Sequence, residues 1–396
     1  MTTGVSLGWL LQPLTVETFL TEIWATRHYV INRCCPGYFD GVFDAAAIEE
    51  YLEFARPERS EVRLIRTADR KAPETYRLAD DTIDLVRIRN EFADGYTIVL
   101  NGLERHVPNI AALAHAIEVE LNFETQVNVY ITPPKSQGFL PHYDDHDVLI
   151  LQISGTKTWH VYDSVADVPS HELRLREMFV KDGLPAPSDL TLEAGDVLYL
   201  PRGRVHAAEA NDEPSIHLTL GIHPPSVLAL VTKALEALGY RDDRVLTRLP
   251  PRYLNDASAR TNLGGLVRDV VGAIDESCVG DAIGALEDSL LRRGRCQLVG
   301  HLIANSFEAD RIDGRTRVMK CQPLYSRVLA LDGGVALQFA QSMVSAGPEH
   351  RAAMLFLSRN TEPFRVGDLP GLSAPQQTEL ARKLVVDGFL IRVPED

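Results

Sequence analysis

Pro141-His142-Tyr143-Asp144-Asp145 is the stretch from which the fold of this 396-residue chain can be worked out. His142 and Asp144 form an H-x-D pair, and residues two apart on a β-strand point to the same face. We therefore expect one imidazole and one carboxylate to aim at the same point. They are two of the three ligands of a facial triad, which holds Fe(II) and leaves other coordination positions open. The pair predicts a second histidine further along the chain.

His206 is the candidate third ligand. It follows the strand-like run Val197-Leu-Tyr-Leu-Pro and lies 62 residues after Asp144. An isolated H-x-D pair arises by chance in many chains, where it is an ordinary polar pair in a loop. The late histidine at a suitable spacing favours a metal site instead. His146 would compete as a ligand if the strand continued through it, but we expect a loop there and place His146 beside the ligands or at the surface.

Lys157 lies fifteen residues after His142, following the apolar run 148–153 and a turn at Gly155. A co-substrate such as 2-oxoglutarate chelates a metal through its 2-oxo acid end, and its far carboxylate needs a buried cation at a fixed reach. Lys157 is well placed for that ion pair, whereas its position alone would suggest a solvated lysine in a turn.

Three further polar residues lie on strands that we expect beside this site. Asn128 and Tyr130 are two residues apart on one strand face, and Thr219 lies on the strand that closes the N-terminal half. Each could hydrogen-bond a co-substrate or line the pocket. Taken singly, each fits an ordinary hydrogen-bonded polar residue of the core better.

Short strands with glycine and proline corners dominate residues 1–224, without an alternation of strands and helices. Strands are predicted at 29–32, 60–67, 75–79, 126–132, 148–153, 158–162, within 192–201 and at 215–222, and helices at 44–56, 81–91 and 109–123. Thr15 is a candidate cap for a helix near the N-terminus. Asp144 and His206 must meet although they are far apart in sequence, which indicates a mostly β fold, the double-stranded β-helix or cupin jelly roll.

The pattern changes after Pro224. Helical periodicity covers 226–239, 263–275 and 281–307. Strands at 319–330 and 335–339 flank the hairpin signal Asp332-Gly333-Gly334, and are followed by helices at 349–357 and 374–387 and a last strand at 388–393. Helix, turn, helix and strand at the end of a chain suggest a winged helix. We therefore expect three domains, at 1–224, 225–312 and 313–396.

Composition and charge limit the class of protein. The net charge of -15 argues against a general nucleic-acid coat protein. Residues 1–224 hold 19 Lys and Arg against 34 Asp and Glu, whereas the remainder holds 21 of each. An acidic N-terminal half suits a basic partner, and it equally serves solubility. The neutral C-terminal part lacks the basic stripe of a DNA reader, so nucleic-acid binding by the winged helix is not expected.

The cellular compartment follows from what the sequence lacks. The five cysteines show no C-x-x-C spacing and suit free thiols in a reducing compartment; they are Cys34, Cys35, Cys278, Cys296 and Cys321. We find no secretion signal, and no apolar run approaches the roughly 18–20 residues that span a membrane. We therefore expect a cytoplasmic protein with no membrane partner.

Four motifs together resemble the JmjC ribosomal oxygenases. They are Asn128-Val-Tyr-Ile-Thr-Pro, Pro141-His-Tyr-Asp-Asp, Leu151-Gln-Ile-x-Gly-x-Lys-x-Trp-x-Val-Tyr and Pro201-Arg-Gly-x-Val-His. The opening Trp9-Leu-Leu-x-Pro-Leu-Thr-Val-Glu-x-Phe is also similar to that family. The motifs cover about residues 8–223, and the C-terminal third resembles the family in pattern only, with a helical dimerisation region followed by a winged helix.

The resemblance implies hydroxylation of a histidine or arginine of a basic ribosomal protein by an enzyme that uses Fe(II), 2-oxoglutarate and O2, and that forms a homodimer. It implies these roles: His142, Asp144 and His206 bind iron and carry the catalysis; Lys157, Asn128 and Thr219 bind the co-substrate; Tyr130 and Gly221 lie on the substrate side. Gly221 departs from the pattern, because relatives place a serine there that helps to position the substrate side chain.

Two other functions remain open at this stage. The same chemistry could serve a tailoring hydroxylase that acts on a small peptide or metabolite. Alternatively, the chain could be a JmjC-like binding or regulatory protein whose winged helix contacts nucleic acid or protein, although an intact triad with Lys157 speaks against this. Histone demethylation uses the same cofactors, but nothing in the sequence marks a pocket for methyl-lysine.

Overall fold

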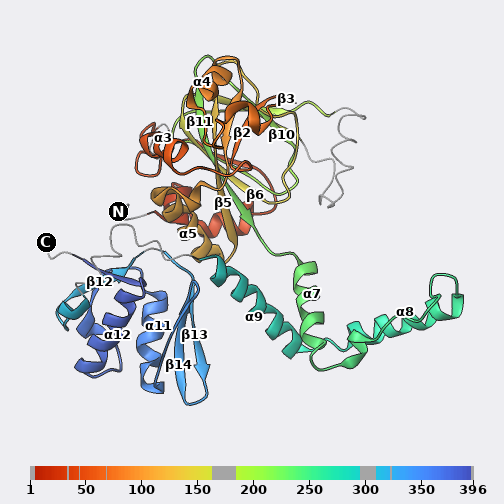
Figure 1. Cartoon of the computed structure of the whole chain (residues 1–396), viewed down its shortest axis with the longest axis vertical. Coiled ribbons are helices and arrows are strands. Elements are labelled where there is room, and N and C mark those ends of the chain that lie inside the picture. The colour runs from red at the N-terminus through yellow and green to blue at the C-terminus, as the bar shows by residue number, and fades with distance from the viewer. Residues whose placement is uncertain are drawn as a thin grey trace.

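The computed structural model describes residues 5–33, 35–43, 45–67, 69–162, 184–294, 309–321 and 323–393. Cys34, Cys296 and the end of the helix predicted at 281–307 lie outside these ranges. Figure 1 shows the sheets of the N-terminal half in the upper lobe, an α/β unit of the C-terminus at lower left, and an arm of helices at lower right. No helix among the described residues combines the length and apolar character needed to cross a bilayer.

Two antiparallel sheets form the N-terminal lobe. The larger has the order β1-β9-β6-β11-β5-β4-β2-β3 and the smaller β10-β7-β8. Their strands are β1 (Tyr29–Ile31), β2 (Val62–Arg66), β3 (Asp69–Arg70), β4 (Thr97–Leu100), β5 (Glu124–Thr132), β6 (Asp147–Ser154), β7 (Lys157–Val161), β8 (Ser188–Leu192), β9 (Val197–Leu200), β10 (His206–Ala210) and β11 (Ser215–His223). This mostly β arrangement confirms the predicted cupin-type fold.

Apolar side chains fill both sides of the large sheet. Between the sheets, residues of β6 and β9 such as Ile150 and Leu198 pack on Trp159 and Leu192 of the small sheet. On the outer face, a larger core joins the sheet to the helices α1 (Leu7–Leu11), α3 (Ala45–Phe54), α4 (Leu85–Ala93) and α5 (Pro108–Leu121). Burial of this area is the main favourable contribution to folding. The strands that border the space between the two sheets are therefore held in place by packing on both faces of the large sheet.

Several predicted elements need correction. Residues 75–79 are not a strand: Pro73–Tyr76 is a 3-10 turn, η2, because the Tyr76 ring is buried and its hydroxyl donates to the Val62 carbonyl at 2.8 Å. Strands β4 and β8 were not predicted. The segment 319–330 is two strands, β12 (Arg317–Lys320) and β13 (Ser326–Leu331), which belong to different sheets. Pro323 lies between them and cannot donate to a ladder.

Among the described residues, three helices follow the β lobe. They are α7 (Val227–Leu238), α8 (Ala257–Gly272) and α9 (Glu276–Arg293). A small core of Ala234, Leu238, Cys278 and Ala282 holds α7 against α9. No residue of α8 is buried, and in Figure 1 this helix projects away from both lobes.

The C-terminal unit combines two small sheets with two helices. The sheets are β16-β12-β17 and β13-β14-β15, and the further elements are β14 (Gly334–Phe339), β15 (Ser342–Ala346), α11 (Arg351–Arg359), β16 (Phe364–Arg365), α12 (Ala374–Val386) and β17 (Leu390–Arg392). The predicted hairpin joins β13 to β14, with Gly333 at φ +77°. Glycine suits this turn because it adopts positive φ without strain.

Candidate metal and co-substrate site

A pocket of about 950 Å³ opens between the two sheets. Its walls come from β5, β6 and β11 of the large sheet and from β7 and β10 of the small one. The pocket is lined by seven of the eight residues singled out from the sequence: Asn128, Tyr130, His142, Asp144, Lys157, His206 and Thr219. The fold thus gathers side chains from segments far apart in sequence.

His142, Asp144 and His206 converge in this pocket. One ligand atom from each lies within 4.8 Å of the others, and Asp144 Oδ2 is 3.7 Å from His206 Nε2. The sequence predicted a strand for the H-x-D segment, but the structure has an isolated β-bridge there. His142 N donates to the His206 carbonyl at 3.0 Å, and His206 N donates to the His142 carbonyl at 2.7 Å. This direct backbone pairing brings the two imidazoles together, with ring centroids 4.5 Å apart.

Both imidazoles are held in the tautomer that a metal needs. His142 Nδ1 lies 2.8 Å from the Leu140 carbonyl, and His206 Nδ1 lies 2.9 Å from the Arg204 carbonyl. A carbonyl oxygen only accepts, so each Nδ1 carries the proton and donates it. Each Nε2 then keeps its lone pair for a metal. Two imidazole nitrogens and one carboxylate suit Fe(II), and the residues present fit such an ion.

Lys157 begins β7 and is buried at the inner end of the pocket, with 4% of its surface exposed. Its Nζ donates to Thr132 Oγ1 at 3.0 Å, and it pairs with no carboxylate among the described residues. Burial lowers the pKa of Lys157 to about 7. The ammonium is therefore an uncompensated cation that an entering carboxylate would stabilise. The alternative of a solvated turn lysine is excluded by this burial.

Three residues near Lys157 were not singled out from the sequence. Thr132 lies two and four residues after Tyr130 and Asn128, so the period of β5 could have revealed it. His217 and Trp159 also line the pocket, and neither His217 Nδ1 nor Trp159 Nε1 has a hydrogen-bond partner in the described part of the chain. Buried polar atoms of this kind normally find a partner, which indicates a polar occupant of the pocket.

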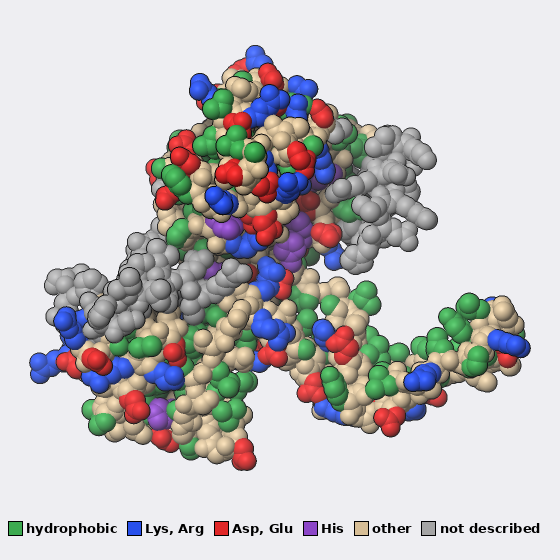
Figure 2. Space-filling model, in the orientation of Figure 1, with side chains coloured by type: hydrophobic (Ala, Val, Ile, Leu, Met, Phe, Trp, Pro, Cys, Tyr) green, Lys and Arg blue, Asp and Glu red, His purple; other side chains and the backbone are tan. Residues whose placement is uncertain are grey.

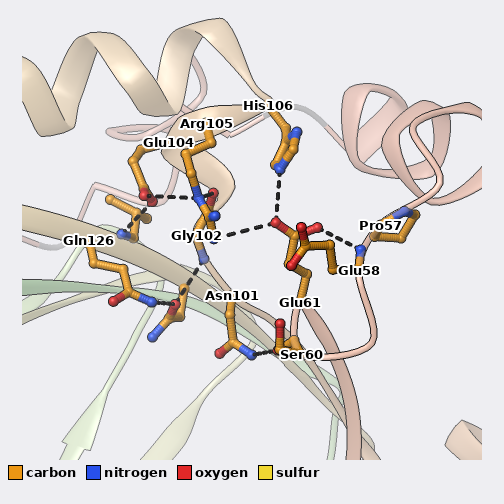
Figure 3. Close-up of polar contacts among 12 residues, drawn as sticks. Pro57, Glu58, Ser60, Glu61, Asn101, Gly102, Glu104, Arg105, His106 and Gln126 are labelled. Atoms are coloured by element: carbon orange, nitrogen blue, oxygen red, sulfur yellow. Dashed lines mark hydrogen bonds and ion pairs between the residues drawn. The ribbon is translucent and has the colours of Figure 1, made fainter. Parts of the chain in front are cut away.

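Asn128 is oriented by a network at the pocket wall, whose members Gly102, Glu104 and Gln126 are labelled in Figure 3. Its Oδ1 accepts from Gly102 N and from Gln126 Nε2, both at 3.1 Å. The loop that presents Gly102 is held by Glu104, whose Oε2 accepts from Val127 N at 2.8 Å. Because the Asn128 oxygen is occupied, its amide N–H groups are the part left for the pocket. Asn128 thus offers donors rather than acceptors.

Tyr130 stacks flat on His217, with ring centroids 4.7 Å apart and an interplanar angle of 3°. Burial, together with the negative charge of Asp144, raises the pKa of Tyr130 to about 12. The phenol is therefore neutral and can donate a hydrogen bond near the triad. Thr219 faces Asn128 across the β5–β11 ladder and completes this wall.

Gly221, which the sequence places on the substrate side, is not one of the residues that line the pocket. The His146 ring covers it: a Cβ added at Gly221 would lie 2.9 Å from this ring. The His146 ring is tilted by 31° against the His223 ring, with centroids 4.3 Å apart, and His146 is one of the lining residues. Glycine therefore makes room for an imidazole that a serine at this position would displace. The sequence did not reveal this role of His146, because it depends on the register between β6 and β11, which brings the residue just before β6 next to Gly221.

Fold and site together define a JmjC-type cupin protein with a two-histidine, one-carboxylate centre. The family profile of the JmjC domain matches residues 103–230. Two Escherichia coli structures described as the ribosomal oxygenase YcfD share the fold: one gives a TM-score of 0.57 at 18% identity over 96% of this chain and 98% of that one. The other, in complex with cobalt and 2-oxoglutarate, gives 0.56 at 18% identity over 96% and 99%.

Sequence comparison gives the family. Mouse ribosomal oxygenase 2 is 30% identical over 357 residues, which cover 86% of this chain and 72% of the mouse protein. The chain belongs to the JmjC ribosomal oxygenase family. It is also 30% identical over 236 residues to the Drosophila mojavensis bifunctional lysine-specific demethylase and histidyl-hydroxylase NO66, covering 58% of this chain. The chain spans 26–50% of the length of this protein and of two other insect NO66 relatives.

Proposed function

We propose that this protein is an Fe(II)- and 2-oxoglutarate-dependent oxygenase that hydroxylates a histidine or arginine of a ribosomal protein. The observation that carries the proposal is one pocket with a metal-ready triad and a buried lysine that lacks an acidic partner. The names of the mouse and Drosophila relatives support the ribosomal substrate and the histidine target. The acidic charge of residues 1–224 suits a basic ribosomal protein.

The residues divide the work along the pocket. Iron bound by His142, Asp144 and His206 would supply, with 2-oxoglutarate and O2, the oxidising power for an unactivated C–H bond. Lys157 and Thr132 would hold the far carboxylate of the co-substrate, with Asn128 and Thr219 as further polar contacts. Tyr130 and His146 would contact the substrate side chain. The buried walls of the pocket would keep water from the reacting groups.

Comparison of ribosomal proteins from cells with and without this protein tests the proposal. Intact-mass spectrometry is expected to show one ribosomal protein that loses the mass of one oxygen atom in the deletion strain. Restoring the wild-type gene should return the mass, whereas the Asp144→Ala gene should not, because it removes the carboxylate ligand. Unchanged masses for all ribosomal proteins would favour a small peptide or metabolite as substrate instead.

We propose that the enzyme is a homodimer and that the remaining two-fifths of the chain contain the region through which it dimerises. The domains are the catalytic unit at 1–224, a dimerisation region at 225–312 and a winged helix at 313–396. Support for the dimer comes from α8, which has no fully buried residue within one chain, and from the hydrophobic side chains that Figure 2 shows along the arm. A helix with exposed apolar residues gains stability when a second surface covers it.

Light scattering should give the mass of a dimer for the full-length protein at micromolar concentration. Val267 and Val271 of α8 are 60% and 48% exposed and lie one turn apart on the same face. Changing both to glutamate is expected to give a monomer, because the carboxylates would be buried without partners. Val86→Glu, at a 70% exposed site on α4, is the control and should stay dimeric. A monomeric wild type would contradict the proposal.

A further inference from the structure

The pocket extends beyond the barrel onto the outer strands of the large sheet. Arg63 on β2 pairs with Val99 on β4, which in turn pairs with Tyr130 on β5. Residues directly opposite one another in a ladder share a face, so Arg63 lies on the same face as Tyr130. Arg70 on β3 pairs with Ile65, two residues after Arg63 and on that face too. Both arginines line the pocket.

Within the described part of the chain, these two arginines have no acidic partner. Arg63 donates to Asn101 Oδ1 at 3.0 Å, while its buried Nε has no acceptor. Arg70 is exposed, and neither residue pairs with a carboxylate in the described ranges. The third arginine at the pocket mouth, Arg105, differs because Glu61 and Glu104 lie 3.4 and 3.7 Å from it (Figure 3). The outer part of the pocket therefore carries two uncompensated positive charges.

The surroundings of these two charges are mostly acidic. The catalytic part of the chain has a net charge of -15, from 19 basic and 34 acidic residues. Arg59, Arg77 and Arg87 of this region form ion pairs with carboxylates, which Arg63 and Arg70 do not do among the described residues. A pair of guanidinium groups left open on a pocket wall provides charge-assisted hydrogen bonds for an incoming carboxylate.

We propose that Arg63 and Arg70 form a subsite for an acidic side chain of the substrate polypeptide, close to the residue that enters the metal pocket. The proposal rests on the proposed function and narrows its substrate class. Two strand spacings separate Arg63 from Tyr130, about 10 Å, which an extended peptide crosses in roughly three residues. A polynucleotide is disfavoured, because the acidic domain repels a run of phosphates while a single carboxylate avoids that repulsion.

A peptide library tests the subsite without turnover. Peptides with a central histidine or arginine carry Asp, Ser or Lys at each nearby position, and are retained on the full-length protein with Fe(II) and 2-oxoglutarate in the absence of O2. We expect Asp to be enriched about tenfold over Lys at one position roughly three residues from the centre. In the R63E/R70E variant the enrichment should reverse towards Lys, and in R63K/R70K part of it should remain.

Arg66→Glu is the control, because it makes the Arg→Glu change once, on β2 outside the pocket lining, and should keep the Asp enrichment. Melting curves of each variant check that it is folded. No Asp preference in the wild type, or one that persists in R63E/R70E, would overturn the subsite. Competition by polyuridylate that R63E/R70E abolishes would also overturn it, in favour of RNA. Succinate formation is measured separately, so failure of the oxygenase function remains distinguishable from failure of the subsite.

Discussion

His142→Ala is expected to lower the affinity for the metal by more than about 100-fold, because even partners behind metal ligands typically contribute 10–100-fold. Succinate formation from 2-oxoglutarate should fall at least as far. The ring supplies one of only two imidazole ligands, and the Leu140 carbonyl already orients it. The backbone bridge to His206 does not depend on the side chain, so the fold should survive.

Metal titration and succinate release measure these effects. His160→Ala is the matched control: His160 lies on β7 but faces Asp189 and Glu209, 2.7 and 3.5 Å from its ring nitrogens, and does not line the pocket. Its loss should leave metal affinity and turnover unchanged. Equal turnover by wild type and His142→Ala would mean that the triad is not the reaction centre.

Lys157→Met is expected to raise the KM for 2-oxoglutarate by about 100-fold or more, since a buried carboxylate that loses its charged partner typically costs 3–5 kcal/mol. Methionine keeps an unbranched apolar side chain that is one atom shorter, and it removes the charge and the donor to Thr132. The ligand-free variant should melt at a higher temperature than the wild type, because it no longer buries an unpaired ammonium. A Lys157→Met protein with an unchanged KM would exclude the assigned role.

The pKa of Lys157 also sets a pH dependence. Burial lowers this pKa to about 7 in the ligand-free protein, whereas the unfolded chain keeps the ordinary value. The unfolded state thus binds more protons above pH 7, so the free energy of unfolding should rise with pH in that range. Affinity for 2-oxoglutarate should instead weaken above pH 7, because binding requires the protonated lysine. Isothermal titration of wild type and Lys157→Met should show the trend in the wild type only.

The iron end of the site was predictable because it depends on residue type and spacing. His142, Asp144 and His206 were recognisable from their order, whereas the role of Lys157 followed from the co-substrate's need for a cation and from the resemblance rather than from its position alone. The structure changes the reason for their proximity, from a shared strand face to a backbone bridge. That bridge is a long-range contact, which the local pattern around His142 does not encode.

The substrate end was not predictable, because it depends on strand register. Arg63 and Arg70 reach the pocket only through the pairing of β2, β3 and β4, and β4 itself was not predicted. Similarly, the relation between Gly221 and His146 needs the β6–β11 ladder, in which Gly221 faces Val148. The 3-10 helix at residues 73–76 was also not predictable, because it goes with the burial of Tyr76 in the folded protein. Tertiary packing overrides local propensity at such positions.

Transfer of oxygen from O2 into a ribosomal protein tests the central claim most directly. Ribosomal proteins from a strain without this enzyme would be incubated with the purified protein, Fe(II), 2-oxoglutarate and isotopically heavy O2. We predict that a single protein gains the mass of one heavy oxygen atom on a histidine or arginine, with one succinate formed for each oxygen incorporated. Succinate formation without any labelled ribosomal protein, or no succinate at all, would contradict the account.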